Sequence, residues 1–189
     1  MDFLYFLQEL RTPWLDAIVS ALTHLGGELV FLVAALTIFW CRDKRQGYYM
    51  LSVGFLGTLV NQFLKITCRI PRPWVRDPNF TIVESARADA TGYSFPSGHT
   101  QSGVTVFGCL AKRFGGKIFK TVCIFCAVGV GISRLYFRVH TPWDVGMSFI
   151  IGILVIFATE KIYKICESHD LATLIIGFAE TATAIGMGL

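Results

Sequence analysis

Apolar stretches close to twenty residues long recur along the chain, and they restrict its fold more than any other feature. A stretch of this length is what a helix needs to cross the roughly 30 Å hydrocarbon core of a bilayer. The pattern therefore predicts an all-α, multi-pass membrane helical bundle with about six transmembrane helices. Their expected positions are residues 18–40, 47–67, 98–114, 117–137, 142–160 and 171–189.

The overall composition agrees with lipid as the main surrounding of this chain. Hydrophobic residues make up 53% of it and charged residues 16%, whereas soluble domains carry about a quarter charged residues. The 189 residues suffice for one integral-membrane domain, residues 1–189. The net charge of +4 comes without a long basic run or a nucleic-acid motif, so we expect no nucleic-acid partner. Nothing indicates a cofactor or an obligate protein partner.

The N-terminal residues show helical spacing of apolar side chains. No basic residue precedes the first apolar stretch, so a cleaved signal peptide is not expected. The spacing predicts an N-terminal amphipathic helix lying in the membrane interface, although an ordinary packing helix fits equally well. Its apolar positions are Phe3, Leu4, Phe6, Leu7 and Leu10.

Six cysteines raise the question of a metal or redox site. Cys123 and Cys126 form a C-x-x-C pair, but they lie inside an apolar run without a second pair of ligands nearby. Such sites need accessible thiolates, so we interpret both cysteines as small core residues.

Lysine and arginine counts indicate which ends of the spans face the cytoplasm. Nine cations lie in the connections at one side of the membrane and eight at the other. Three of the eight, Lys65, Arg72 and Arg134, belong to a group of polar residues at the span ends, and leaving them out makes the comparison nine against five. The positive-inside rule then predicts a cytoplasmic-membrane protein whose polar group faces the extracytoplasmic side. The nine are Arg42, Lys44, Arg45, Lys112, Arg113, Lys117, Lys120, Lys161 and Lys164.

The polar residues of that group lie where four expected spans end. They flank a long connection, residues 69–97, which contains no apolar run. Antiparallel threading brings all four ends to one membrane face, where hydrocarbon would penalise such residues unless they had a function. Three cations, two histidines, a serine and a carboxylate therefore converge. They are Lys65, Arg72, Ser97, His99, Arg134, His140 and Asp144.

This group of residue types suits phosphoryl transfer. The transition state carries charge on three equatorial oxygens, which cations and forked guanidinium groups stabilise. Ser97 and Gly98 at a helix start offer a hydroxyl and backbone N–H groups, an arrangement that binds anions. One imidazole can attack phosphorus while the other protonates the leaving oxygen.

Three blocks of the sequence carry a resemblance to a known family. They are Lys65-x6-Arg72-Pro73, Pro96-Ser97-Gly98-His99 and Ser133-Arg134-x5-His140-x3-Asp144. Without a substitution, they resemble the signature K-x6-R-P, P-S-G-H and S-R-x5-H-x3-D of the type 2 phosphatidic acid phosphatase superfamily. The match covers residues 65–144.

The resemblance implies roles for eight of the matched residues. It implies that His140 is the nucleophile, Asp144 its orienting partner and His99 the general acid. It also implies phosphate binding by five further residues and activity without a metal ion. Those phosphate-binding residues are Lys65, Arg72, Ser97, Gly98 and Arg134.

Each of these residues, taken alone, has an ordinary structural explanation. Lys65 could extend from a helix end toward the interface, and Asp144 fits a helix N-terminal cap with Thr141. Their joint occurrence at one face favours catalysis. His24 and His169 lie outside the group and receive no role, and Glu180 in the last expected span stays unexplained.

The sequence supports a lipid phosphatase first, acting on a phospholipid or polyprenyl phosphate in the bilayer. Attack by His140 on phosphorus gives a phosphohistidine intermediate, which a lipid phosphatase hydrolyses with water. A phosphotransferase would form the same intermediate but pass its phosphoryl group to a lipid or sugar hydroxyl. Vanadate-dependent haloperoxidases share the anion-binding residues, but they are soluble, and the six apolar spans argue against this class. A transporter or structural membrane protein would not account for the motif residues. Polyprenyl diphosphate, phosphatidylglycerol phosphate and phosphatidic acid all fit, and a short bacterial-looking chain favours the first.

Overall fold

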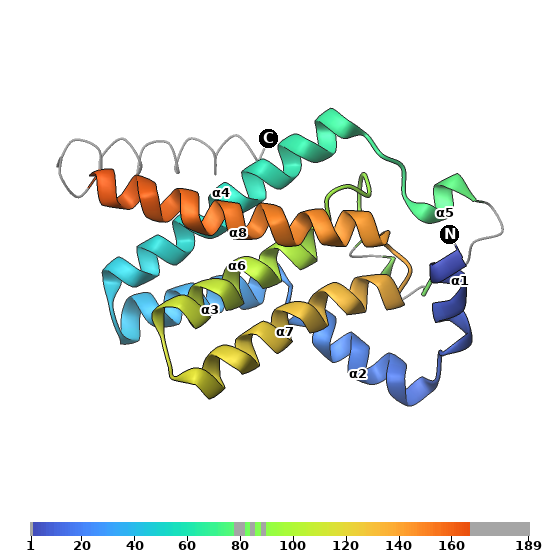
Figure 1. The fold of residues 1–189 in the computed structure, drawn as a ribbon, viewed down its shortest axis with the longest axis horizontal. Helices are drawn as coiled ribbons and strands as arrows, with labels where there is room; N and C mark the ends of the chain where they lie inside the picture. Colours follow the sequence, from blue (N-terminus) through green and yellow to red (C-terminus); the bar gives the residue numbers. More distant parts are fainter. Residues whose placement is uncertain (1, 78–81, 84–85, 88–89, 167–189) are drawn as a thin grey trace.

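The structure is a computed structural model that describes residues 2–77, 82–83, 86–87 and 90–166, and all regular elements in this part of the chain are helices. Figure 1 shows them as a bundle in which the longer helices run along one direction. In chain order they are α1 (Asp2–Glu9), α2 (Pro13–His24), α3 (Glu28–Cys41), α4 (Lys44–Cys68), α5 (Pro73–Arg76), α6 (Gly98–Arg113), α7 (Lys117–Tyr136) and α8 (Pro142–Cys166).

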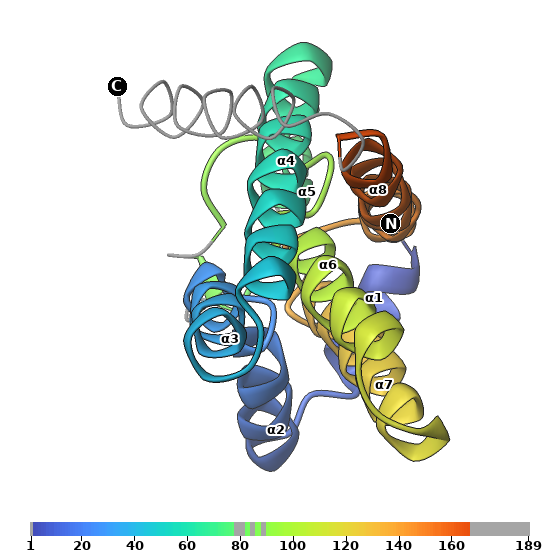
Figure 2. The same ribbon diagram turned by 90° about the vertical axis from the view of Figure 1, so that its left-hand side faces the viewer.

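Helix α6 lies in the middle of the bundle and packs against α3, α4, α7 and α8, as the end-on view of Figure 2 shows. Its apolar side chains share one core cluster with those of α4 and α8, including Val53, Val106 and Val155. A buried amide pair also joins α4 to α6, because Asn61 Nδ2 donates to Gln101 Oε1 at 2.8 Å. The ends of α4, α6 and α8 are therefore fixed relative to one another.

Three helical stretches in the described chain are long and apolar enough to cross a membrane: Lys44–Arg76, Lys117–Tyr136 and Pro142–Ile165. A fourth span is possible if α2 and α3, which are bent by 48°, act together. The outward faces of these helices carry large exposed apolar side chains such as Phe63, Phe125 and Leu154, as expected for lipid contact. The chain is thus an all-helical membrane protein.

The span expected over residues 18–40 is interrupted in the structure, and its two pieces are long and apolar enough to cross a membrane only as a bent pair. The helix stops at His24 and restarts at Glu28, and Gly27 in extended conformation caps the second piece. Two consecutive glycines weaken a helix at this point because glycine loses the most backbone freedom there. The span expected over 171–189, with Glu180, lies outside the described residues, as does His169.

Helix α6 does not qualify as a span by length and apolar character, although residues 98–114 were expected to form one. It has 16 residues, and its first turns are polar but buried, with Thr100 and Gln101 almost fully inaccessible. Protein rather than lipid therefore surrounds the start of this helix.

At the N-terminus, the eight-residue helix α1 lies against α7. Leu4 is buried, whereas Phe6 and Leu10 are exposed. The hydroxyl of Tyr5 donates to Asp77 Oδ2 at 2.7 Å, so α1 is also tied to the connection that follows α5.

Candidate active site

The bundle places the predicted residues around one end, where a cavity of about 620 Å³ opens between the α2–α3 break, α4 and α6. This volume lies in the range of small-molecule sites. Five of the eight predicted residues line it: Lys65, Arg72, Gly98, His99 and His140. Ser97, Arg134 and Asp144 are buried and do not belong to its lining.

Arg72 is held almost rigidly at the wall of this cavity. Its Nε donates to the Gly92 carbonyl at 3.1 Å, and its Nη2 donates to the Thr91 carbonyl at 2.7 Å. Its Nη1 contacts the Val139 carbonyl and His140 Nε2, each at 3.0 Å. The arginine therefore joins the 69–97 connection to the α7–α8 loop and points one edge of its guanidinium at the histidine.

His140 lies in the α7–α8 loop, between Arg72 and Asp144. Because a guanidinium only donates, the contact at Nε2 requires a lone pair on that nitrogen and places the ring proton on Nδ1. Nδ1 lies 3.7 Å from Asp144 Oδ2, longer than a hydrogen bond but close enough for an ionic interaction. Burial, together with the charges of Arg72 and Arg134, lowers the pKa of His140 to about 3, although Asp144 opposes the shift. His140 is thus a neutral imidazole at neutral pH.

Asp144 serves both as a helix cap and as the partner of His140. Its Oδ2 accepts hydrogen bonds from the Thr141 backbone N–H at 2.8 Å and from Ser94 Oγ at 2.6 Å. The Asp144 N–H in turn donates to Thr141 Oγ1 at 3.3 Å, which completes a reciprocal cap. The two explanations of Asp144 that the sequence offered are therefore compatible, since one carboxylate oxygen faces both the helix start and the imidazole.

The start of α6 contributes backbone and a histidine to the cavity rather than the serine hydroxyl. Ser97 is the N-cap residue, and its Oγ accepts from the Thr100 N–H at 3.4 Å and pairs with Thr100 Oγ1 at 2.9 Å. Gly98 and His99 follow in the first turn and line the cavity. The N-terminus of a helix favours anions, so this turn can bind a phosphate oxygen.

Arg134, near the end of α7, lies behind the cavity and is fully buried. Its Nη1 donates to Thr23 Oγ1 at 2.9 Å, which connects α7 to the last turn of α2. Its positive charge nevertheless contributes to the low pKa of His140. Arg134 therefore lies outside the cavity lining, close enough for its charge to affect His140.

Several residues at or near the cavity were not predicted to have a role. His24 and Glu28 flank the α2–α3 break and line it, as do Asn61 and Gln101. Asn61 precedes Lys65 by one helical turn, so its polar side chain in an apolar run was a usable signal. Ser94, which holds Asp144, lies in the irregular 69–97 connection, where no periodicity indicates which side chains turn inward.

The described residues contain no group of three or more His, Cys, Asp or Glu side chains placed to hold a metal ion. Cys123 is buried in α7 and Cys126 is partly buried. Both therefore lie among packed side chains of this helix.

A helical membrane bundle with three histidines and two cations around one cavity fits a membrane-embedded phosphatase that acts on lipid phosphates. The chain belongs to the PAP2 superfamily, whose family model matches residues 44–166, from the start of α4 to the end of α8. It is a hydrolase of the lipid phosphate phosphatase type.

Known proteins of this kind match most of the chain. Phosphatidylglycerophosphatase B of Bacillus subtilis (strain 168) is 32% identical, covering 80% of this chain and 76% of that protein. Undecaprenyl-diphosphatase BcrC of the same organism is 26% identical, covering 76% of this chain and 72% of that protein.

Two solved structures share the fold. The crystal structure of a transmembrane PAP2 type phosphatidylglycerolphosphate phosphatase from Bacillus subtilis matches with a TM-score of 0.70 and 27% identity, covering 86% of this chain and 83% of that one. The structure of Aquifex aeolicus LpxE matches with a TM-score of 0.72 at 24% identity, covering 85% of this chain and 93% of that one. This second likeness concerns the fold alone.

Proposed function

We propose that the protein removes phosphate from a lipid phosphate monoester or diphosphate through a phosphohistidine intermediate on His140. The arrangement of Arg72, His140 and Asp144 supports this proposal. Nε2 carries a lone pair at the cavity wall, Nδ1 faces a carboxylate, and the ring is neutral. A nucleophilic imidazole needs all three properties.

In the first half-reaction, the Nε2 lone pair attacks phosphorus while the bond from phosphorus to the leaving oxygen breaks. Before this attack, the bound phosphate takes over the hydrogen bond of Arg72 Nη1, which frees the Nε2 lone pair. The leaving oxygen takes a proton from the protonated His99 imidazole, which opens α6 across the cavity. Asp144 stabilises the positive charge that develops on the His140 ring.

In the second half-reaction, a water molecule attacks phosphorus and the P–Nε2 bond breaks. Neutral His99 accepts the proton of that water, which returns both histidines to their starting states. Lys65, Arg72 and the first-turn N–H groups after Ser97 and Gly98 bind the phosphate oxygens, and buried Arg134 adds positive charge. The proposed chemistry needs no metal and no cofactor.

The relatives support membrane lipids that carry a phosphate or diphosphate headgroup as the proposed substrates. Phosphatidic acid, phosphatidylglycerol phosphate and polyprenyl diphosphate all present such a group. The identity of 32% to the phosphatidylglycerophosphatase, against 26% to the undecaprenyl-diphosphatase, shifts our preference from the polyprenyl diphosphate to phosphatidylglycerol phosphate. Leu29, Val30 and Phe31 of α3 form an apolar part of the cavity lining, which suits the lipid end of either substrate.

We also propose a membrane arrangement for the single domain of residues 1–189. The chain crosses the membrane six times, with α6 as a short third span and residues 171–189 as the last span. Helix α1 lies in the membrane interface. The candidate active site faces the extracytoplasmic side of the cytoplasmic membrane. The cation-rich connections at the other end of α4, α6 and α8 support this orientation.

Trapping the covalent intermediate tests the proposed mechanism. The purified protein, washed with EDTA, is mixed with ³²P-labelled aryl phosphate and quenched in alkaline detergent. We expect a base-stable, acid-labile phosphoenzyme in the wild type and in His99→Ala, because an aryl group leaves without a proton. His140→Ala should form none.

Three outcomes would contradict parts of this proposal. A phosphoenzyme that persists in His140→Ala and disappears in His99→Ala would reverse the assignment of the histidines. Loss of turnover in EDTA with recovery in magnesium would reject the metal-free mechanism. A labelled lipid or sugar product in place of inorganic phosphate would make the protein a phosphotransferase.

A further inference from the structure

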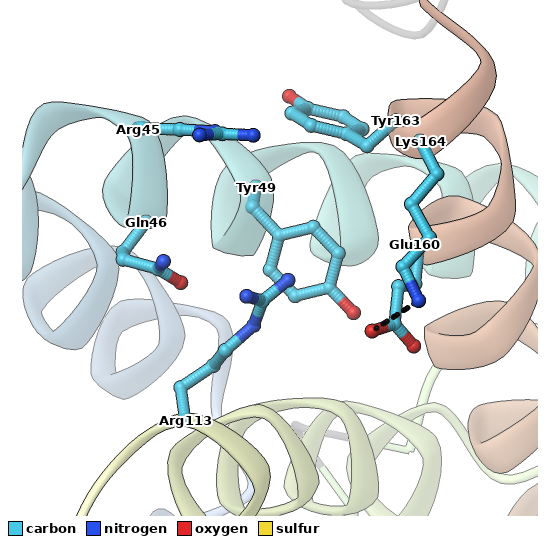
Figure 3. Close-up of a pocket in the computed structure, with 7 residues that line it drawn as sticks. All are labelled: Arg45, Gln46, Tyr49, Arg113, Glu160, Tyr163 and Lys164. Carbon is cyan, nitrogen blue, oxygen red and sulfur yellow. Dashed lines mark ion pairs between the residues drawn. The ribbon is translucent and has the colours of Figure 1, made fainter. Parts of the chain in front are cut away.

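A second cavity, of about 200 Å³, lies at the end of the bundle opposite the candidate active site. Figure 3 shows it between the first turns of α4, the end of α6 and the last turns of α8. Its volume is several times the roughly 30 Å³ that one water molecule occupies in the liquid. Neither the motif nor the proposed reaction uses any residue of this cavity.

Two tyrosines form its floor, and bonds within the bundle hold both. Tyr49 is buried and its hydroxyl donates to the Ile156 carbonyl at 3.0 Å. Tyr163 packs edge-on against Tyr49, with ring centroids 5.6 Å apart, and its hydroxyl lies 2.7 Å from Ser52 Oγ. The floor is therefore aromatic and fixed in place.

Three cations surround this floor, each from a different helix. Arg113 lies over the Tyr49 ring, with its guanidinium carbon 4.5 Å from the ring centroid. Arg45 extends above the floor toward Tyr163, and Lys164 lies on the α8 side (Figure 3). Chain segments far apart in sequence thus present guanidinium and ammonium groups to one small space.

The lining contains one carboxylate beside these three cations. Glu160 forms an ion pair with Lys112, which lies outside the lining, and Lys164 Nζ lies 3.5 Å from its Oε1. The Glu160 charge is therefore shared with a cation that the cavity does not contain. Three cations and one carboxylate thus line the cavity, and a forked guanidinium suits phosphate oxygens in particular.

Exposed aromatic side chains place this cavity at the level of lipid headgroups. Trp40 at the end of α3 and Tyr48 in the first turns of α4 are both largely exposed, at 74% and 54%. Tryptophan and tyrosine with this exposure are typical of the membrane–water interface. A cation-lined hollow between helices at that depth meets the phosphates of the surrounding leaflet.

We propose that the cavity lined by Arg45, Arg113 and Lys164 binds the phosphate of an anionic phospholipid in the leaflet opposite the candidate active site. The lipid phosphate lies between the two guanidinium groups, while its acyl chains follow the apolar outer faces of α4 and α8. The bound lipid phosphate then contacts α4, α6 and α8 at once, at the end of the bundle that contains no motif residue. This inference does not depend on the proposed reaction, because the two sites occupy opposite ends of the bundle.

The test compares charge variants of the full-length protein in neutral detergent. Arg45→Gln/Arg113→Gln removes two cations of the cavity. Lys117→Gln/Lys161→Gln removes two exposed cations from the α7 start and α8, outside the cavity lining. Thermal unfolding is followed while dioleoyl phosphatidylglycerol, dioleoyl phosphatidylcholine or inorganic phosphate is added.

We expect phosphatidylglycerol to raise the Tm of the wild type and of the Lys117/Lys161 variant at the same lipid concentration. The Arg45/Arg113 variant should need about ten times more lipid or show no rise, and phosphatidylcholine should have little effect. Equal responses of both variants, or an equal effect of phosphatidylcholine, would overturn the proposal. A Tm rise with inorganic phosphate that only the Arg45/Arg113 variant loses would assign the cavity to a soluble phosphate and reject the lipid.

Two further measurements keep the test decisive. Turnover of a soluble aryl phosphate confirms that each variant is folded, since neither pair touches the candidate active site. If the Arg45/Arg113 double variant does not fold, the single variant Arg45→Gln is measured in its place. A rise in its Tm with phosphatidylglycerol equal to that of the wild type would reject the site. If the wild type does not hydrolyse the aryl phosphate, the proposed function is contradicted. The Tm response to phosphatidylglycerol would still test the lipid site independently.

Discussion

His140 lies between groups of opposite character, and this position decides its chemistry. Arg72 donates to Nε2 and Asp144 faces Nδ1, so the tautomer is set from both sides. Burial beside two arginines lowers the pKa of His140 to about 3. The ring is therefore neutral before substrate binds, as the proposed nucleophilic role requires, and a phosphate dianion in the cavity would offset the arginine charges.

The low pKa of His140 predicts that acid destabilises the protein. Between about pH 6.5 and 3, the unfolded chain binds a proton at His140 that the folded protein does not bind, so stability falls as pH falls through this window. From pH 6.5 to 5 the expected loss is about 2 kcal/mol. Tm measured in detergent should fall with pH more steeply for the wild type than for His140→Asn.

The exposed His24 supplies the control for this measurement. His24→Asn removes an exposed imidazole and leaves the buried His140 in place. Parallel curves for the wild type and His140→Asn would show that His140 is not the group responsible.

Ser94 is expected to position Asp144 and, through it, His140. Ser94→Ala removes a 2.6 Å hydrogen bond to the Asp144 carboxylate, and bonds to charged groups contribute about 1.5–3 kcal/mol. We expect kcat to fall roughly tenfold to a hundredfold with little change in KM. Ser148→Ala is the matched control, because this equally buried serine donates to the Asp144 backbone carbonyl and not to its carboxylate. Equal losses in the two variants would make the role of Ser94 merely structural.

At the scale of helices, the break between α2 and α3 brings backbone close to the start of α6. A Cβ at Gly26 would lie 2.6 Å from the His99 carbonyl oxygen and 2.5 Å from Val130 Cγ1. Only glycine permits this approach, and the same break supplies part of the cavity lining. The break between these two helices therefore lies against the His99 backbone as well as lining the cavity.

Gly26→Ala should push this break away from His99. Overpacking of this kind costs about 1–3 kcal/mol, so we expect a lower Tm together with a reduced kcat on a lipid substrate. Gly146→Ala in α8 serves as the control, since a Cβ there meets nothing within 4 Å. A Gly26→Ala protein with the stability and activity of Gly146→Ala would mean that the close approach is unimportant.

At the scale of the whole molecule, the bundle has two chemically different ends. One end holds the cavity with His99 and His140, and the other holds the cavity with Arg45 and Arg113. Native cysteines mark both ends, since Cys68 is exposed at the end of α4 and Cys41 is exposed at the end of α3. These two positions allow the orientation in the membrane to be measured.

We expect Cys68 to react with an impermeant maleimide in intact cells and Cys41 to react only after the membrane is disrupted. Two variants that each retain one of these cysteines, with all others replaced by alanine, are labelled before and after lysis. Aryl phosphate turnover checks that both are folded. The reverse pattern would place the candidate active site on the cytoplasmic side.

The sequence alone was sufficient for the class of fold and the family. Apolar stretches and helix-end residues are local features, so Lys65, His99 and His140 could be placed at one end of a helical bundle from spacing alone. The family match agrees with that interpretation. The individual catalytic and phosphate-binding roles remain predictions for the experiments above.

Only the tertiary structure decided which side chains enter the cavity and which support it from behind. Ser97 and Arg134 share a motif with the lining residues, yet Ser97 caps α6 and Arg134 bonds to Thr23 of α2. Ser94 reaches Asp144 across fifty residues of chain. Spacing along a chain reports which residues share a helix face, whereas the direction of a buried polar side chain depends on partners that packing brings from distant segments.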